Sequence, residues 1–535
     1  MTYDVLICGY GPAGEVAANL LGQRGIRTLV IDKSTDVYQV PRAVHFDGEV
    51  MRIFQSLGVE DEVQSVSDIP DSLTFTNGKG GILIHAKTRD IPGRQGWPSG
   101  NFFNQPMLEE MLRKAAERYP TVEVRLGWAL ESFTQDGESV TATIRRAADG
   151  EREEVSARFL LGCDGAGSAT RECAGLELED LRCEEPWLVC DVIADEGFPY
   201  RRDIYQFCDP RRPVTLVPCE GRHLRWEFML MPGDDPEELE SEESVHRLMA
   251  PYIGRLNPDL RPENTRLLRH KVYTFHGLVA VQWRAGRVFI LGDAAHQTPP
   301  FLGQGLCAGV RDAYNLIWKL EGVLTGRFRD TVLDTYGTER RPHARAVVKQ
   351  ALRIGKVIQT RNPLMAFLRD RYFALARFLP MLLAPFLWEP SWPLGLGLFA
   401  SGDPPSRESA HGNPFDQPVV ETPDGRRARL DEVIGTGFVV LGLDLDPADG
   451  LDRETRATFD RLDTTFLCVR PKGGRASSDD EVVDADGFTA AWFARHGGGR
   501  ILVMRPDRQV FGKFDSAAEL AGAATTLRER LLGPT

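Results

Sequence analysis

Apolar positions in the first part of the chain alternate between short unbroken runs and runs with helical spacing. Tyr3–Cys8 and Thr28–Ile31 are unbroken runs that predict buried strands, and Glu15–Gln23 between them has the spacing of a helix. The same order recurs much later, where Val288–Leu291 predicts a strand and apolar residues return at helical intervals from Leu306. Strands that alternate with helices indicate an α/β fold.

The middle of the chain has a different pattern. Short β-branched and aromatic runs alternate with turns at Trp187–Asp191, Tyr205–Cys208, Val214–Pro218 and Arg225–Met231. This alternation predicts an antiparallel sheet. Because these runs lie between the two strand–helix segments, we expect the sheet to be an insertion into the α/β fold.

The C-terminal part is predicted to form a separate unit. Helical spacing continues over Arg327–Gln350, and proline and glycine then accumulate between Glu389 and Pro414, which is typical of a linker. The chain closes with a helix at Ser516–Leu532, preceded by predicted strands at Gly437–Asp444, Thr465–Val469 and Ile501–Met504. A length of 535 residues exceeds what one core supports, so two or three domains are expected.

Composition narrows the class of partner. The chain carries 64 Lys and Arg against 77 Asp and Glu, a formal net charge of −13, which argues against nucleic acid or an anionic membrane as partner. The first strand is predicted to begin at Tyr3, so we expect no secretory signal. The nine cysteines include no Cys-x-x-Cys pair, which favours buried thiols in a reducing cytoplasm. We expect no metal site.

One later segment, Phe378–Trp388, is strongly apolar. It is too short to span a bilayer and is followed by Glu389 and prolines. We therefore expect it to lie in the core or at a subunit interface, as in a homodimer.

A glycine-rich loop follows the first strand. Gly9, Gly11 and Gly14 have the G-x-G-x-x-G spacing, in which the glycines permit a tight turn, close approach of the backbone to a pyrophosphate, and close helix packing. Asp32 ends the second strand 18 residues past Gly14, where an acid binds a ribose hydroxyl. The loop predicts an adenine dinucleotide and does not distinguish FAD from NAD.

Two further loops follow predicted strands. Asp164 follows Arg158–Cys163, and Asp293 follows Val288–Leu291. In open α/β sheets, ligands bind at these carboxyl ends of strands. A helix begins just past Gly305, so its free N–H groups and positive dipole end would stabilise an electron-rich carbonyl such as the pyrimidine edge of a reduced flavin.

The loops around Asp164 and Asp293, and the helix after Gly305, resemble the DG and GD motifs of class A flavoprotein monooxygenases, the aromatic hydroxylases related to p-hydroxybenzoate hydroxylase. Over its full length the chain looks most like the members that act on 3-(3-hydroxyphenyl)propionate. The resemblance implies a FAD-binding Rossmann-like βαβ fold with an inserted antiparallel substrate sheet and a thioredoxin-like C-terminal domain, here without Cys-x-x-Cys. The implied divisions are 1–180 and 270–390 for FAD, 181–269 with part of 70–105 for substrate, a linker at 391–417, and the C-terminal domain at 418–535.

The implied activity is that of an FAD-dependent aromatic-ring monooxygenase. NADH or NADPH, bound transiently, reduces FAD, and O₂ then forms a flavin C4a-hydroperoxide whose distal oxygen is transferred to a small phenol. The residues implied to hold FAD are Gly9, Gly11, Pro12, Ala13, Gly14, Asp32, Lys33, Arg42, Gln105, Asp164, Gly292, Asp293, Pro300, Gly303, Gly305 and Leu306.

The resemblance also supplies substrate and catalytic candidates. Aromatic residues of the sheet are expected to line the substrate pocket, although strand aromatics are also common in ordinary cores; they are Tyr205, Phe207, Trp226 and Phe228. A base near the phenol hydroxyl would help the reaction, and the sequence does not identify it. His45 and Tyr205 are candidate bases, and Pro299 begins the loop expected to exclude water and stabilise flavin charge. His296 either fixes its loop or contacts substrate.

Three other functions compete with that of an aromatic hydroxylase. A flavin-dependent halogenase would carry a Trp-x-Trp-x-Ile-Pro segment, which the chain lacks. A hydroxylase of a polycyclic antibiotic intermediate would share all three flavin motifs and the C-terminal domain, so it stays open. A flavin-binding protein without turnover also stays open.

Overall fold

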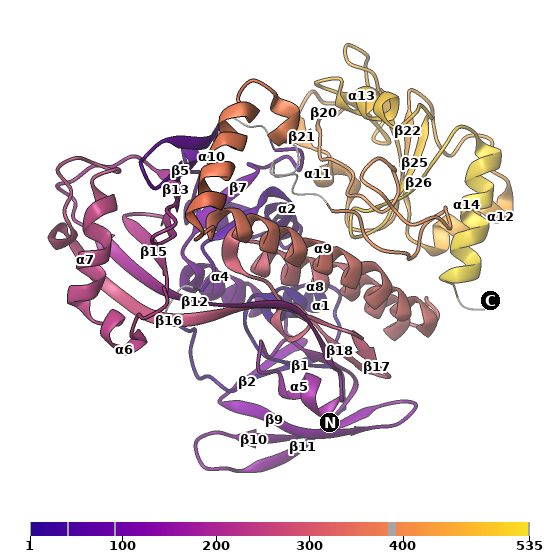
Figure 1. The fold of residues 1–535 in the computed structure, drawn as a ribbon. Helices are drawn as coiled ribbons and strands as arrows, with labels where there is room; N and C mark the ends of the chain where they lie inside the picture. Colours follow the sequence, from indigo (N-terminus) through magenta and orange to yellow (C-terminus); the bar gives the residue numbers. More distant parts are fainter. Residues whose placement is uncertain (1, 40–41, 90–92, 384–391, 533–535) are drawn as a thin grey trace.

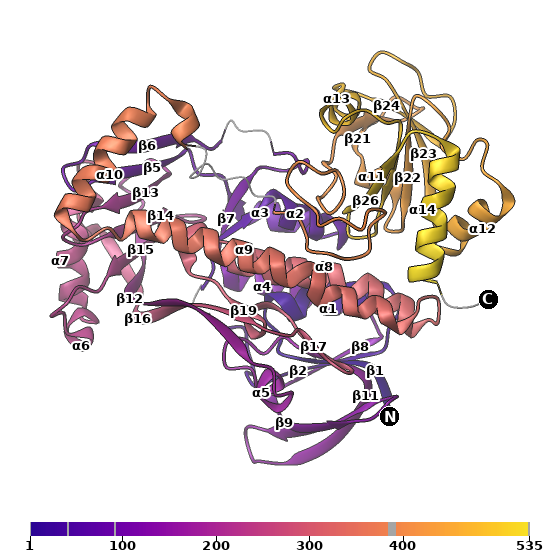
Figure 2. The ribbon, with the colours of Figure 1, turned by 45° about the vertical axis from the view of Figure 1, so that its right-hand side comes forward.

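The computed structural model describes residues 2–39, 42–89, 93–383 and 392–532. This part of the chain contains three large sheets and one small one (Figure 1). The long helix α9 (Thr335–Ile358) runs across the middle of the molecule, with the C-terminal unit above it in Figure 2.

The first sheet is built from segments far apart in the chain. Its strands are β1 (Thr2–Cys8), β2 (Thr28–Asp32), β8 (Val122–Leu126), β9 (Trp128–Gln135), β10 (Val140–Arg146), β11 (Arg152–Gly162), β17 (Arg284–Ala285) and β18 (Val288–Ile290). Strands β18, β11, β1, β2 and β8 lie side by side in that order and are parallel, which confirms the predicted α/β fold.

Alternate residues of β1 enter two different cores. Val5 and Ile7 pack with three helices, α1 (Pro12–Gln23), α4 (Gln105–Ala116) and α8 (Gly305–Leu324). Leu6 and Cys8 pack on the other face against the hairpin of β9 and β10. The sheet is therefore covered on both faces, as its unbroken apolar runs require.

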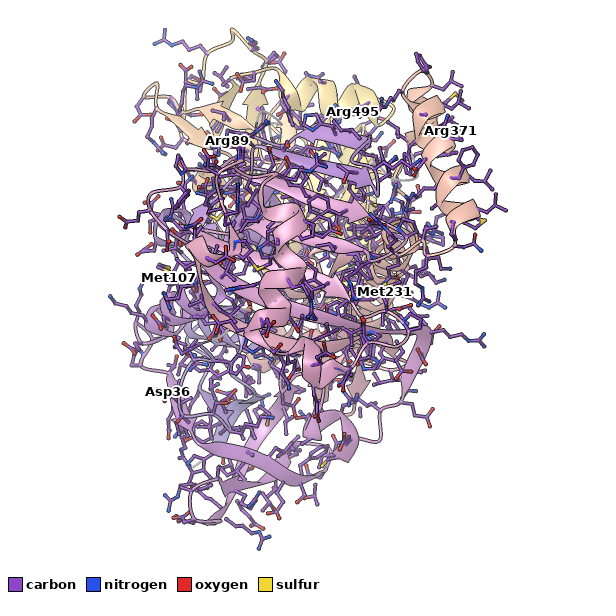
Figure 3. All side chains as sticks on the ribbon, turned by 60° about the vertical axis from the view of Figure 1, so that its left-hand side comes forward. Asp36, Arg89, Met107, Met231, Arg371 and Arg495 are labelled. Atoms are coloured by element: carbon purple, nitrogen blue, oxygen red, sulfur yellow. The ribbon has the colours of Figure 1, made fainter. Side chains whose placement is uncertain are left out.

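The second sheet is the predicted antiparallel insertion. Its order is β19-β16-β12-β15-β14-β13-β5-β6, and all neighbours are antiparallel except β13 and β5. The strands are β5 (Ser72–Asn77), β6 (Ile82–Lys87), β12 (Leu178–Ala194), β13 (Asp203–Cys208), β14 (Val214–Pro218), β15 (His223–Met229), β16 (Thr265–Ala280) and β19 (His296–Gln297). Helix α7 (Glu242–Ile253), preceded by α6 (Pro236–Leu239), packs on its outer face and lies in front in Figure 3.

A small sheet connects these two units. It has the order β3-β7-β4, with β3 (His45–Asp47), β4 (Ser67–Asp68) and β7 (Gly100–Phe103). Helices α2 (Gly48–Ser56) and α3 (Glu60–Ser65) lie between β3 and β4 in the chain. Asp47 accepts the Val50 N–H at 3.1 Å and so caps α2.

The C-terminal unit is a mixed sheet with helices. Its order is β21-β20-β24-β23-β22-β25-β26, in which β22 is parallel to β23 and antiparallel to β25. The strands are β20 (Val419–Glu421), β21 (Arg427–Arg429), β22 (Val439–Leu443), β23 (Thr465–Arg470), β24 (Glu481–Asp484), β25 (Ile501–Met504) and β26 (Val510–Phe514), and the helices are α11 (Asp431–Ile434), α12 (Arg453–Arg461), α13 (Phe488–Arg495) and α14 (Ala517–Arg530). The predicted strands and closing helix are present, and the likeness to thioredoxin stays a prediction.

The predicted linker packs closely on the rest of the chain where it is described. Trp392, Leu394 and Leu398 are buried. The Gly395 N–H donates to the Glu339 carbonyl of α9 at 2.8 Å. The segment therefore joins α9 to the C-terminal unit through fixed contacts.

Helix α10 (Pro363–Ala376) carries exposed apolar side chains at the outer edge of the molecule, where Figure 3 labels Arg371. Phe367 is 55% exposed and Phe378, just after the helix, is 82% exposed, so the described start of the predicted apolar segment is not core. Residues 384–388 of that segment lie outside the described residues. Within the described residues, no helix combines the length and apolar character needed to cross a bilayer.

Candidate active site

The three loops predicted to bind the cofactor meet at one edge of the first sheet. Neighbouring parallel strands β18, β11, β1 and β2 end there, and Asp293, Asp164, Gly9 and Asp32 lie at or just past their ends. The Gly9 N–H donates to the Ile31 carbonyl at 2.8 Å, which joins two of these ends. The other predicted contacts lie in the same loops or at the adjoining helix starts: Pro12, Ala13, Lys33, Pro299, Pro300, Gly303, Gly305 and Leu306.

The glycine-rich loop leaves open space at Gly11. A Cβ at Gly9, where φ is +101°, would lie 2.3 Å from the Cys163 carbonyl oxygen, and a Cβ at Gly14 would lie 2.1 Å from the Gly9 carbonyl oxygen. A Cβ at Gly11 would have no described neighbour within 4 Å. Gly11 precedes α1, and no side chain caps that helix, so its first N–H groups are available to a phosphate.

Asp32 is tied to the same loop. Its carboxylate accepts the Tyr10 N–H at 2.7 Å and the Ser34 N–H at 2.7 Å. Arg113 of α4 donates to the Tyr10 carbonyl at 2.6 Å and to Glu15 at 2.9 Å, which fixes the loop from the other side. Carboxylate oxygens carry further lone pairs, so Asp32 can still accept a ribose hydroxyl.

Asp164 fixes the loop in which it lies. Its carboxylate accepts the Ser168 hydroxyl at 2.5 Å, and the Thr170 N–H at 2.9 Å and hydroxyl at 3.0 Å. These bonds hold the start of α5 (Ala169–Cys173) against the end of β11. A contact between Asp164 and FAD stays a prediction.

The loop after β18 packs on the start of α1. A Cβ at Gly292, where φ is +60°, would lie 3.3 Å from the Ala13 Cβ. His296 Nε2 lies 2.8 Å from Asp312 Oδ2, which also accepts the Gly292 N–H at 3.0 Å, so His296 fixes this loop. The Asp293 side chain is exposed to solvent. Desolvation by the protein atoms around it nevertheless raises the pKa of its carboxyl.

Gln105 and His45 hold the segment beside these loops. Gln105 Oε1 accepts the N–H groups of Arg42 at 2.7 Å and Ala43 at 2.6 Å, whereas the Arg42 side chain is exposed. His45 Nδ1 lies 3.2 Å from the Gly303 carbonyl oxygen. Burial lowers the pKa of His45, so the ring is neutral near pH 7.

Arg311 locks the start of α8 to β3, a feature that sequence analysis missed. Its guanidinium lies 2.5 Å from the Asp47 carboxylate, which also accepts from Gln304 at 3.0 Å, and all three side chains are buried. No side chain caps α8, so the N–H groups of Gly305 and Leu306 can face an electron-rich ligand atom. An Asp before one helix and an Arg inside another form no local sequence pattern.

The four aromatic residues predicted to line the substrate pocket lie on the outer face of the second sheet. They pack in one cluster with Val245 of α7: Tyr205, Phe207, Trp226 and Phe228. Side chains alternate along a strand, so this face is opposite to the one that carries Arg225. The structure thus gives them a packing role, and the Tyr205 hydroxyl lies 3.4 Å from Asp203. This corrects the expected lining, which took account of residue type and not of strand phase.

The inner face carries a buried charged cluster that sequence analysis also missed. The Asp191 carboxylate lies 2.7 Å from His223, 2.9 Å from Arg225 and 3.1 Å from Arg269. Burial alone would raise the pKa of the Asp191 carboxyl. Arg225 and His223 outweigh this effect and hold that pKa well below its usual range. Arg225 also donates to the Arg42 carbonyl at 2.7 Å, so this face meets the cofactor loops. Charged and apolar residues alternate along β15, and this alternation in the sequence could have indicated that one face of the strand carries charge.

The described residues include no group of three or more His, Cys, Asp or Glu side chains that could hold a metal ion. The open space at Gly11, the uncapped start of α8 and the accessible Asp293 instead fit an elongated dinucleotide along one sheet edge.

Comparison with known proteins gives two family matches and several full-length relatives. The family described as FAD binding domain matches residues 2–351, and the family described as HcaD C-terminal domain matches residues 412–530. The chain is 36% identical to 3-(3-hydroxy-phenyl)propionate/3-hydroxycinnamic acid hydroxylase of Burkholderia cenocepacia, covering 98% of this chain and 96% of that protein. It is 37% identical to a probable NADH-specific resorcinol 4-hydroxylase of Rhodococcus jostii, covering 98% and 94%.

Solved structures agree on the fold. The ternary complex of aklavinone-11 hydroxylase with FAD and aklavinone has a TM-score of 0.78 and 25% identity, covering 99% of both chains. The flavin-dependent monooxygenase PieE, in complex with FAD and substrate, has a TM-score of 0.80 and 20% identity over 99% of both chains.

Proposed function

The chain belongs to the family of FAD-dependent aromatic hydroxylases, and we propose that its substrate is a small phenol with a carboxylate-bearing side chain, similar to 3-(3-hydroxyphenyl)propionate. The observation that carries this proposal is the 36% identity with the Burkholderia cenocepacia enzyme over 98% of the chain. The reductant is NADH or NADPH, and the name of the Rhodococcus jostii relative favours NADH.

We propose that three parts of the site hold FAD. Gly11 and the first turn of α1 bind the pyrophosphate, Asp32 binds the ribose, and the uncapped start of α8 at Gly305 faces the pyrimidine edge. FAD, when bound, supplies electron transfer from the nicotinamide and the activation of O₂. The protein then supplies position, charge and exclusion of water.

Apolar residues next to these loops fit the exclusion of water. Phe301, which follows Pro300, packs edge-on against Trp187 of β12 with ring centroids 5.8 Å apart. Both rings are buried, and Met229 of β15 joins the same cluster. We propose that this cluster covers the reacting side of the site and keeps bulk water out.

We propose the division of the chain expected from the sequence, with 1–180 and 270–390 for FAD and 181–269 with part of 70–105 for substrate. The pairing of β5 with β13 supports the assignment of residues near 70–90 to the substrate sheet. The C-terminal residues 418–535 take a structural role, and nine unpaired cysteines support a reducing compartment such as the cytoplasm.

The proposed activity predicts substrate-dependent turnover. With bound FAD, 3-(3-hydroxyphenyl)propionate is expected to raise NADH consumption at least about tenfold and to give a product one oxygen atom heavier. Oxygen uptake, NADH absorbance and mass spectrometry measure this, with NADPH in a parallel arm. Stimulation by polycyclic phenols alone would favour the antibiotic-type alternative, and bound FAD without stimulation by any phenol would indicate a protein without turnover.

We also propose that the exposed apolar side of α10 binds a second copy of the chain. Leu364, Phe367 and Phe378 are each more than half exposed, which is unusual for a group of large apolar side chains. Sedimentation is expected to show a dimer for the unchanged protein and a monomer for Phe367→Glu, with equal FAD content. Val281→Glu, at an exposed apolar residue elsewhere, is the control. A monomeric unchanged protein would refute the proposal.

A further inference from the structure

Glu227 lies on the inner face of β15 between two residues that reach the cofactor loops. Two positions before it, Arg225 donates to the Arg42 carbonyl at 2.7 Å. Two positions after it, Met229 packs in one cluster with Phe301 of the loop after β18. Alternate residues of a strand share a face, so Glu227 faces the region between these two contacts. The proposed function puts the flavin ring and the substrate on this side of the sheet.

Glu227 is a buried carboxyl without a structural partner. Its side chain is 8% exposed, and within the described part of the chain it makes no hydrogen bond or ion pair. Its cross-strand neighbours are Val189 and Thr215, and the Thr215 hydroxyl donates to Gln206 at 2.7 Å instead. The Glu227 oxygens are not among the fully enclosed polar atoms that lack a partner, so they reach the space beside the sheet, where a polar group of a ligand can contact them.

The charges around Glu227 leave it close to neutrality. Arg225 and His223 lie on its own strand, Asp191 on β12 and Arg269 on β16, whereas β13 and β14 turn uncharged side chains toward it. Asp191 already pairs with all three cations. Desolvation therefore dominates and raises the pKa of Glu227 to about 7. A base with such a pKa is suited to proton transfer near neutral pH.

We propose that Glu227 is the base that accepts the proton of the substrate's phenol hydroxyl, an inference that rests on the proposed function. The phenolic O–H bond breaks, an O–H bond forms on a carboxylate oxygen of Glu227, and the electron pair stays on the phenolate oxygen. That pair makes the ring carbons ortho and para to it more nucleophilic toward the oxygen that the cofactor delivers. When the hydroxylated ring carbon releases its hydrogen as a proton to water and the ring regains its aromaticity, the carboxyl group returns its proton to the phenolic oxygen, so that Glu227 ends as a carboxylate.

Glu227→Gln tests this role because it keeps the shape of the side chain and removes the base. Hydroxylation turnover is expected to fall about 100-fold with little change in FAD content or KM. The unchanged enzyme gains rate as the pH rises through about 7, since the base must be deprotonated, and the variant is expected to lose this dependence. Glu184→Gln, an exposed residue of β12, makes the same charge change as a control.

A ring-fluorinated phenol, whose hydroxyl has a lower pKa, tests whether Glu227 acts as a base or only has a structural role. Such a phenol ionises without help, so it is expected to restore Glu227→Gln to within about tenfold of the unchanged enzyme. Glu227→Asp keeps a carboxylate and is expected to keep the pH dependence, which serves as the test if the glutamine variant does not fold. A loss that is equal for all phenols, or a Glu227→Asp variant without the pH dependence, overturns the inference. If the unchanged enzyme binds FAD and hydroxylates no phenol, the proposed function itself fails.

Discussion

Gly11→Val is expected to give a folded protein that no longer holds FAD. The backbone at Gly11 is extended, with φ of −95° and ψ of −173°, which valine adopts readily. No described atom lies within 4 Å of the added Cβ, so the substitution fits the protein alone. The side chain would instead fill the place proposed for the pyrophosphate. We expect FAD affinity to fall at least about 100-fold, or ~2.7 kcal/mol.

Flavin absorbance per protein and titration of FAD-free protein measure this effect. The unfolding temperatures of the FAD-free variant and FAD-free unchanged protein are expected to agree. Gly197→Val is the matched control, because Gly197 is exposed in a loop far along the chain and also has no neighbour within 4 Å. A Gly11→Val protein with the flavin content of the unchanged protein would refute the placement of the pyrophosphate.

The cofactor side of the site could be predicted because its determinants are local. Gly9 and Gly14 are required because a Cβ at either position would lie only 2.3 Å or 2.1 Å from a backbone carbonyl oxygen, so they leave a fixed spacing in the sequence. The apolar runs of β1 and β2 are unbroken because both faces of the sheet are covered. Parallel pairing then brings Asp164 and Asp293 to the same edge without any further information.

The substrate side could not be predicted from residue type, because it depends on which face of a strand α7 covers. Along β15, Trp226 and Phe228 turn toward α7, while Arg225 and Glu227 turn inward. The sequence shows that apolar and charged residues alternate along this strand. It does not show which of the two sets faces the inside of the molecule. Contacts between remote elements, such as Arg311 of α8 with Asp47 of β3, depend on packing of the whole fold and leave no local pattern.

A second large effect is expected at the junction between α9 and the C-terminal unit. The carboxylate of Glu339 lies 2.8 Å from Arg505 of the turn after β25 and 2.7 Å from Lys319 of α8, and it accepts the Leu398 N–H at 2.9 Å. All three side chains are fully buried. Burial alone would raise the pKa of the Glu339 carboxyl. Arg505 and Lys319 outweigh this effect and hold that pKa far below its usual range.

Glu339→Gln is therefore expected to destabilise the protein by about 3–5 kcal/mol, because it leaves the buried Lys319 ammonium without its carboxylate. Denaturant unfolding at pH 7 measures this, and limited proteolysis shows whether the C-terminal unit is released first. Burial lowers the pKa of Lys319 to about 8 even beside Glu339. In the Glu339→Gln variant, the pKa of Lys319 in the folded protein falls further. The unfolded chain then binds one proton more than the folded protein. The free energy of unfolding of the variant therefore rises with pH. The deficit of the variant is expected to narrow between pH 7 and 9.

Lys319→Met in the same background tests the cause. If uncompensated charge is responsible, removing the Lys319 ammonium from the Glu339→Gln variant recovers part of its lost stability. Lys319→Met alone leaves Glu339 paired with Arg505, so it is expected to lower the stability less than Glu339→Gln does. Arg505 keeps Asp507 at 2.6 Å in all of these variants, so its own charge stays compensated. Additive losses for the two substitutions would mean that Glu339 acts through packing and not through charge. The C-terminal unit would then be held to α9 mainly by apolar contacts.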